Sequence, residues 1–311
     1  MLYISMPAPK THKTHKNHSK GRHSHKTRKR KPKLKSMKCS PKNKKDVLPY
    51  TCYTTSALDK LKTVWNARHP DQTINSNSPR EIWEKLRYYM QDTCSTESCW
   101  LRHQCIKHDI DKSLWGKHFA PYSPAKWKEN PKEWLTTVDI QKVMAQWEKA
   151  YKHFEFIGPS PIDYDTHMVF GECVWEELCK FSLGQMKRRG ITKVGVIFNL
   201  DKHNQSGSHW VAVFIDMKMR TIYYIDSYGD PIPSRISKFC DFVKKQGENF
   251  GENYEIVISK KRHQYSNSEC GMYSMYFLLQ LLQGTPHSTF EKVRVPDSLM
   301  LKLRKEYFNS K

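Results

Sequence analysis

The 311-residue chain carries a net charge of +22 at pH 7 and is 38% hydrophobic, so it has enough length and apolar content for one large domain or two smaller ones. No apolar run reaches the roughly 18 residues that a membrane-spanning helix needs, and the N-terminal "MLYISM" is too short for a secretion signal. Nine irregularly spaced cysteines without such a signal predict reduced thiols in an intracellular setting. We therefore expect neither a membrane protein nor a secreted one.

Positive charge is concentrated in residues 1–48, which we expect to form a disordered basic tail. Of the 53 Lys and Arg residues, 16 lie in the first 50 positions, where Asp46 is the one acidic residue. The segment has almost no apolar side chains, so it cannot bury enough surface to offset the entropy of ordering. We expect residues 10–45 to bind nucleic acid or another polyanion; a nuclear-localisation patch in "KTRKRKPKLK" and a merely solubilising tail are the alternatives.

Residues 49–125 are predicted to form a small helical arm. The stretches "TSALDKLKTVWNARH" and "SPREIWEKLRYYM" repeat apolar side chains at helical spacing, and the second begins with a Ser–Pro pair typical of a helix N-terminus. Downstream, Cys94, Cys99, His103 and Cys105 only faintly resemble zinc ligands, because the tight Cys-x-x-Cys pair is missing. We expect these cysteines to be buried packing thiols, with no metal site and no cofactor.

Residues 126–311 predict an α+β domain. Helical patterns come first, at 134–152 and 171–190, and "GPSPID" between them predicts a turn. The later elements are strands at 193–200, 209–216, 221–227 and 254–259, a helix at about 233–247, and a last helix from Cys270 to about Gly284. These elements predict a mixed sheet. The last helix is apolar on all sides, which predicts a position in the middle of the domain.

Cys270 follows a polar loop and begins this apolar helix. A helix N-terminus stabilises a thiolate, the nucleophilic form of cysteine; a cysteine that only fills space in the core is the alternative. A nucleophilic thiol needs a histidine as base and a carboxylate that orients the base. His209 begins one predicted strand and Asp226 ends the next, so antiparallel pairing places residue 209 opposite about 227, beside Asp226. The spacing therefore predicts Cys270, His209 and Asp226 as catalytic residues.

Gln264 lies six residues before Cys270, in the loop that enters the helix. Its side-chain amide and the backbone N–H of Cys270 are predicted to donate to the oxyanion that forms on a substrate carbonyl. Two other carboxylates are rivals of Asp226. Asp216 lies at the far end of the hairpin, about 23 Å away along a straight strand, and Asp230 lies beyond the strand, so we discount both.

Taken together and in this order, these motifs resemble the ubiquitin-like-protein (SUMO) protease superfamily. The matching positions are His209-Trp210, Asp226-Ser227, Gln264 and Cys270-Gly271, with Trp134-Leu135 at the family's "WL" near the start of the domain. The superfamily includes the adenovirus endopeptidase and the polyprotein-processing proteases of large DNA viruses such as African swine fever virus. The chain is most similar to the viral branch in "GPSPIDYD", in "YYIDSYGDPIP" and in its helical arm, and the resemblance covers about residues 130–285.

The resemblance implies a papain-like, adenain-like cysteine protease core that acts as a monomer. The protein substrate it implies is a viral structural polyprotein, cut after a small residue such as glycine in the virion and the virus factory of the host cytoplasm. Trp210 is expected to cover the His–Asp pair from solvent or simply to pack beside the sheet, with Gly271 in support.

Two alternatives stay open at the level of the sequence. One is a protease that removes a ubiquitin-like modifier or processes its precursor; Thr136-Thr137 count against it, because the family often has Asn-Asp there, close to the substrate channel of SUMO proteases. The other is a catalytically silent scaffold that binds nucleic acid. Neither alternative involves a membrane.

Overall fold

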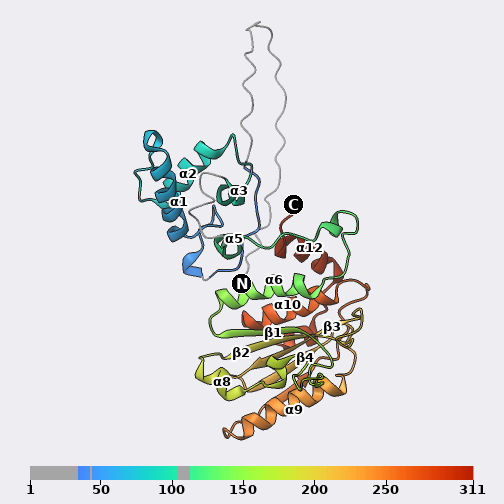
Figure 1. Cartoon of the computed structure of the whole chain (residues 1–311). Coiled ribbons are helices and arrows are strands. Elements are labelled where there is room, and N and C mark those ends of the chain that lie inside the picture. The colour runs from blue at the N-terminus through green and yellow to red at the C-terminus, as the bar shows by residue number, and fades with distance from the viewer. Residues whose placement is uncertain (1–33, 43, 104–112, 311) are drawn as a thin grey trace.

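Figure 1 shows the fold of the computed structural model, which describes residues 34–42, 44–103 and 113–310. A group of helices from the first part of the chain lies beside a larger layered unit that is built on a five-stranded sheet. This is the α+β architecture that the sequence predicts. Among the helices in these ranges, none is long and apolar enough to cross a membrane.

The arm is helical, as predicted. Its helices are α1 (Thr55–Arg68), α2 (Pro79–Met90), α3 (Glu97–Arg102) and α5 (Ser113–His118), with 3-10 turns η1 (Lys44–Asp46) and η2 (Pro70–Gln72). Thr54 and Ser78 cap α1 and α2, since each side-chain oxygen accepts a hydrogen bond from a backbone N–H of the first turn. Pro79 then occupies a first-turn position, where its missing N–H costs nothing. The arm has an apolar core of its own, in which Tyr53 and Trp100 are fully buried.

Residues 34–42 and 44–48 have defined contacts, so the expectation of disorder up to residue 48 is wrong for this part of the basic tail; residues 1–33 lie outside the described residues. The backbone of Lys38 donates to Asn309 Oδ1 at 2.7 Å and accepts from Asn309 Nδ2 at 3.0 Å. Met37 packs on the arm core. These residues escape disorder because they are bound at both sides, to the arm and to the C-terminal segment.

Six of the cysteines within the described residues form disulfides, which corrects the expectation of reduced thiols. The pairs are Cys39–Cys52, Cys94–Cys99 and Cys173–Cys179. Cys94 and Cys99 are therefore bonded to each other rather than to a metal ion or as separate packing thiols, and Cys105 lies outside the described residues. Cys240 and Cys270 are free thiols.

The sheet is mixed, as predicted, and its strands follow the order of the chain. They are β1 (Phe154–Pro161), β2 (Lys193–Asn199), β3 (Trp210–Asp216), β4 (Thr221–Ile225) and β5 (Glu255–Ile258). The outer pairs β1–β2 and β4–β5 are parallel, whereas β2–β3 and β3–β4 are antiparallel. β3, in the centre, is buried over its whole length.

Helices cover both faces of the sheet (Figure 1). On one face lie α6 (Thr137–Ala150), α10 (Cys270–Leu282) and α12 (Asp297–Tyr307), and on the other lie α8 (Leu183–Arg188) and α9 (Ser234–Glu248). Alternate side chains of β3 enter the two cores, with Ala212 and Phe214 on the α10 side and Val211 and Val213 on the α9 side. The almost complete burial of α10 confirms its prediction as the central helix. The remaining short helices are η3 (Ala125–Lys128), α7 (Glu176–Cys179) and α11 (Ser288–Lys292).

Two local predictions are wrong. The "GPSPID" stretch was expected to be a turn, but Gly158–Pro161 ends strand β1, and the two prolines lie at or beyond a shift in the register with β2. A strand tolerates proline at such irregular positions, where no ladder N–H is needed. The predicted helix 171–190 is split into α7 and α8, because Ser182 accepts a hydrogen bond from the N–H of Gln185 and so caps a new helix.

Truncations at two points test the order of residues 34–48. Deletion of 1–33 removes none of the contacts described above, so we expect the free energy of unfolding to stay within about 0.5 kcal/mol of that of the full chain. Deletion of 1–48 removes the Lys38 contacts and the Cys39–Cys52 disulfide, and we expect it to cost at least about 2 kcal/mol. Urea denaturation measures both, and equal stability of the two truncated proteins would contradict the described contacts.

Candidate active site

His209 and Asp226 meet at the open end of the β3–β4 hairpin. His209 immediately precedes β3 and Asp226 immediately follows β4, and His209 Nε2 lies 2.7 Å from Asp226 Oδ1. The pairing of Asp216 with Thr221 sets the register of the hairpin. Continued outward, this register places residue 228, rather than 227, opposite His209. The sequence thus predicted the contact correctly and the register to within one residue.

Cys270 reaches the same point from another part of the chain. It is the first residue of the 13-residue helix α10, whose side chains share an apolar core with β3. The His209 ring hydrogen-bonds to Asp226, and both Asp226 and Cys270 interact with the ring so as to raise its pKa. Because Nε2 serves the carboxylate, Nδ1 is the ring nitrogen left for the thiol. The structure therefore brings the three predicted catalytic residues together.

The pKa of His209 is raised to about 9. Burial alone lowers the pKa, because it disfavours the charged ring. The hydrogen bonds and charges of Asp226 and Cys270 outweigh burial and favour the imidazolium. Asp226 itself is 1% exposed, so water screens this interaction little.

Tyr228 is a site residue that the sequence did not reveal. Its ring stacks on the His209 ring, with 4.7 Å between centroids and 18° between planes. Its backbone N–H donates to Asp226 Oδ1 at 2.8 Å, the oxygen that also accepts from His209. Tyr228 therefore limits the rotation of both groups. A tyrosine two residues after the carboxylate was visible in "DSYG", but only the register of the hairpin places it against the histidine.

Gln264 is fully buried in the loop before α10. Its Oε1 accepts from Ser227 Oγ at 2.7 Å, while Nε2 donates to the Ser266 carbonyl at 2.7 Å and to the Tyr228 hydroxyl at 3.3 Å. The backbone N–H groups of His263 and Gln264 both donate to the Ser227 carbonyl. The amide is thus held next to the His–Asp pair, and its longer contact, to Tyr228, is the weaker of its two donated bonds.

Trp210 and Gly271 pack against the same residue, Leu135. Trp210 is 6% exposed, and its Nε1 donates to the Leu135 carbonyl at 3.2 Å. A Cβ added to Gly271 would lie 3.2 Å from both Leu135 Cβ and Trp210 Cδ1, closer than ordinary van der Waals contact. The residue after Cys270 therefore has to be small for the tryptophan to pack here.

A buried ion pair holds the residue before the thiol. Glu269 accepts from Arg304 Nε at 2.7 Å, and the two side chains are 1% and 3% exposed. Arg304 also donates to the carbonyls of Glu133 and Ser268, and its guanidinium lies 4.5 Å from the centre of the Trp127 ring. Each of these contacts joins α12 to the entrance of α10 or to the segment before α6.

Asp297, at the start of α12, fixes the rest of the loop. It accepts hydrogen bonds from the Tyr265 N–H, the Ser266 hydroxyl and the Tyr273 hydroxyl. Arg294 donates to the His263 carbonyl at 2.9 Å. Neither Asp297 nor Arg304 follows a local sequence pattern, since both act on residues about thirty positions away.

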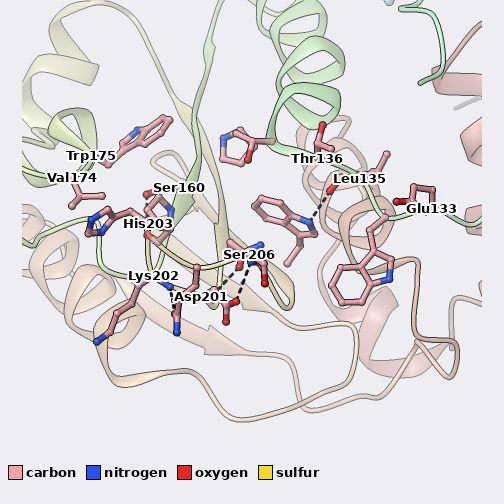
Figure 2. Close-up of a pocket in the computed structure, with 18 residues that line it drawn as sticks. Glu133, Leu135, Thr136, Ser160, Val174, Trp175, Asp201, Lys202, His203 and Ser206 are labelled. Atoms are coloured by element: carbon pink, nitrogen blue, oxygen red, sulfur yellow. Dashed lines mark hydrogen bonds between the residues drawn. The ribbon is translucent and has the colours of Figure 1, made fainter. Parts of the chain in front are cut away.

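A cleft with a volume of about 470 Å³ begins at Trp210. Figure 2 shows its lining, with Leu135 and Thr136 on one side and Trp175 and His203 on the other. The exposed Trp134 also lines the cleft. Thr136 serves mainly as the cap of α6, in a reciprocal capping box with Asp139. The lining residue Trp210 directly follows His209 in the chain, so the cleft begins next to the His–Asp pair.

The rival carboxylates do not reach the histidine. Asp216 lies at the turn of the hairpin, where it accepts from the N–H groups of Lys218 and Met219. Asp230 is exposed beyond β4.

Comparison with known proteins gives a match to the same region. Residues 191–311 match the family described as the Ulp1 protease family, C-terminal catalytic domain. A thiol protease of Acanthamoeba polyphaga mimivirus is 34% identical over 202 residues, which are 62% of this chain and 62% of that protein. The SUMO-1 cysteine protease of African swine fever virus is 26% identical over 254 residues, which are 76% of this chain and 91% of that protein.

The fold has a counterpart of known structure. The crystal structure of the African swine fever virus protease superposes with a TM-score of 0.63 at 20% identity and covers 88% of this chain and 96% of that one. At this identity the likeness concerns the fold. It extends beyond the sheet and its helices, since it covers most of the chain.

Breaking the Glu269–Arg304 pair tests its structural importance. Arg304→Met leaves a buried carboxylate unpaired, and we expect it to lower the free energy of unfolding by about 3–5 kcal/mol. The double variant Glu269→Gln with Arg304→Met removes both charges and is expected to recover part of that loss. Glu84→Gln, which breaks an exposed pair with Arg80, is the control and should cost at most about 0.5 kcal/mol. A loss below about 1 kcal/mol for Arg304→Met would contradict a buried pair.

The raised pKa of His209 has a consequence for stability. The ordinary pKa of 6.5 applies to the unfolded chain and about 9 to the folded one. The protonated ring therefore contributes stability that is complete below pH 6.5 and is lost as the pH rises through about 9. Asp226→Asn is expected to lower the pKa of His209 and to weaken this decline. Histidine NMR titration and urea denaturation from pH 6 to 9.5 measure the two effects, with Asp230→Asn as the exposed control. An unchanged titration in Asp226→Asn would show that the carboxylate does not hold the ring charged.

Proposed function

Because residues 191–311 match the Ulp1 protease family and the chain is similar to viral thiol proteases, we propose that it hydrolyses peptide bonds with Cys270 as nucleophile, His209 as base and Asp226 as the group that orients the base. The observation that carries this proposal is the position of the His209 ring, which is hydrogen-bonded to a buried carboxylate and has its pKa raised by the carboxylate and the thiol together. In such an arrangement the carboxylate fixes the ring and stabilises its positive charge.

The proposed reaction starts from the ion pair in which the Cys270 proton has already passed to Nδ1 of His209, in line with the raised pKa of the ring. The first turn of α10 favours negative charge on the sulfur, because the N-terminus of a helix carries a partial positive charge. The thiolate attacks the carbonyl carbon of the scissile bond, and the imidazolium then gives its proton to the leaving amine. Water attacks the acyl-enzyme, with His209 again as base, and restores the thiol.

Two donors are proposed to bind the oxyanion of the tetrahedral intermediate. As the first residue of α10, Cys270 has a backbone N–H without a partner inside the helix. Gln264 supplies the second donor if the oxyanion replaces the Tyr228 hydroxyl, its more distant partner at 3.3 Å. The bonds of Gln264 to Ser227 and Ser266 keep the amide in place during this exchange.

The substrate is proposed to be a viral structural polyprotein cut after a small residue such as glycine. Three observations support it: similarity to proteases of two large DNA viruses, a cleft lined by Trp210, the neighbour of His209, and the close packing beside the nucleophile. Leu135 and Trp210 crowd the backbone of Gly271, so little room remains for a large substrate side chain next to Cys270. With this substrate, the enzyme acts as a monomer in the virion and in the virus factory of the host cytoplasm.

Removal or maturation of a ubiquitin-like modifier is the second candidate. It is favoured by the name of the African swine fever virus relative, which is called a SUMO-1 cysteine protease. The two candidates share the catalytic residues and differ in what the cleft accepts, so a folded modifier and a linear precursor distinguish them.

The basic tail is proposed to bind nucleic acid through residues 10–45. The support is its charge, since binding by Lys and Arg alone is independent of base sequence and weakens with salt. Residues 34–42 and 44–45 are part of the ordered contacts, so the larger share of this binding is assigned to residues 10–33.

Loss of the nucleophile tests the proposed chemistry. Cys270→Ala is expected to abolish cleavage of a core-polyprotein precursor, and Gln264→Ala to lower kcat by about 100- to 1000-fold through loss of an oxyanion donor. Gln283→Ala, an exposed glutamine just beyond α10, should cleave normally. Gel analysis of the precursor and of a ubiquitin-like fusion in parallel gives both activity and substrate class. Equal processing by wild type and Cys270→Ala would remove the protease assignment.

Deletion of residues 1–33 tests the role of the tail. The truncated protein is expected to keep its peptide turnover, because the site lies in residues it retains, and to bind duplex DNA more weakly with a smaller salt dependence. Fluorescence anisotropy over a range of salt concentrations measures the affinity. Unchanged DNA affinity would mean that the tail does not bind the DNA, and the proposed role of residues 10–33 would be wrong.

A further inference from the structure

Three side chains with metal-ligating atoms converge outside the proposed catalytic site. The ligand atoms of His167, Cys173 and Cys179 all lie within 4.8 Å of one another. His167 Nε2 is 3.8 Å from Cys173 Sγ. Nothing in the proposed peptidase chemistry uses these residues.

The spacing fits a zinc ion. With bonds of about 2.3 Å to sulfur and about 2.1 Å to nitrogen in a tetrahedral site, two ligand atoms lie roughly 3.6 Å apart. The His167–Cys173 distance of 3.8 Å is close to this value. The Cα atoms of Cys173 and Cys179 are 6.3 Å apart, which lets both sulfurs turn toward one ion.

Short-range backbone contacts hold the three residues in position. His167 and Cys173 pair across an antiparallel bridge, and the Val174 N–H donates to the Thr166 carbonyl at 2.9 Å. The short helix α7 then returns the chain so that Cys179 faces the bridge. These backbone contacts do not depend on the Cys173–Cys179 disulfide, so they also hold the three residues near one another when the disulfide is reduced.

Nearby acidic residues favour a cation. Glu176 and Glu177 lie in the first turn of α7, between the two cysteines, and Glu172 lies in the loop before them. Glu176 Oε1 accepts from the Cys173 N–H at 2.8 Å, so its charge is held next to the cluster. Lys180 is the one basic residue on α7 or at its C-cap, and it pairs with Glu176.

We propose that His167, Cys173 and Cys179 bind a zinc ion when the two cysteines are reduced, with water as the fourth ligand. The sulfurs of Cys173 and Cys179 can form the disulfide or bind the ion, but not both at once. Reduction by a phosphine adds two electrons and two protons to the disulfide and yields two thiols, and zinc then displaces both thiol protons.

The ion would close the base of an apolar loop at the edge of the cleft. Between His167 and Cys173, Val169 is 94% exposed and Phe170 is 89% exposed. Val174, directly after the loop, lines the cleft. Zinc binding would fix this edge under conditions in which the disulfide is reduced.

Metal binding is measured on the full-length Cys270→Ala protein, so that the test depends neither on activity nor on the catalytic thiol. After reduction with a phosphine, the protein is expected to bind one Zn²⁺ by elemental analysis at this site. With Co²⁺ it should show the visible bands of a tetrahedral ion and a thiolate-to-cobalt charge-transfer band. His167→Ala is expected to weaken Zn²⁺ binding by at least about 10-fold, and Cys173→Ser and Cys179→Ser to abolish it.

Controls separate this site from other thiols and imidazoles of the chain. The double variant Cys94→Ser with Cys99→Ser removes two other thiols that the phosphine frees, and His153→Ala removes an exposed imidazole, so both variants should keep the metal. Absence of Zn²⁺ from the reduced protein would overturn the proposal. Equal Zn²⁺ binding by Cys173→Ser and its parent would also overturn it, because the metal would then be bound elsewhere.

Discussion

The hydrogen bond between His209 and Asp226 is the interaction on which the site depends. Two strand ends, seventeen residues apart in sequence, are brought together by the β3–β4 hairpin, and the resulting 2.7 Å contact is almost wholly buried. Burial of an imidazole normally favours its neutral form, but here the carboxylate and the thiol reverse the effect and raise the pKa to about 9. The same bond orients the ring, since it occupies Nε2 and leaves Nδ1 for the thiol. The orientation of the His209 ring and its positive charge therefore both depend on the contact with Asp226.

The C-terminal segment makes the rest of the site rigid. Residues 294–304 bind the loop from His263 to Glu269 at several points, through a backbone carbonyl, a shared carboxylate and a buried ion pair. A few residues later, Asn309 bonds to the backbone of Lys38 and of Ala120. One short stretch thus connects the arm, the basic segment and the entrance of α10. This arrangement gives the arm a physical route to the nucleophile, because a shift of α12 would move both sets of contacts.

The sequence predicted the features that depend on local pattern and missed those that depend on distant contacts. The placement of His209, Asp226 and Cys270 could be predicted because hairpin geometry and the start of an apolar helix are local properties. Arg304 could not be found in this way, since its partner lies 35 residues earlier in the chain. The second half of strand β1 was mistaken for a turn because it contains two prolines, and only pairing with β2 makes it a strand. The ordered part of the basic tail was missed for the same reason, as its composition indicates disorder and its contacts lie on other segments.

The most direct test is the rate at which iodoacetamide modifies Cys270 at neutral pH, followed by mass spectrometry of its peptide. Cys240 is the internal reference, because burial raises its pKa to about 12 and keeps it a thiol. The account predicts that Cys270 reacts much faster than Cys240 in the wild type, and that His209→Ala slows Cys270 by about 100-fold or more. An unchanged rate in His209→Ala would show that the imidazole does not activate the sulfur, and the proposed chemistry would be wrong.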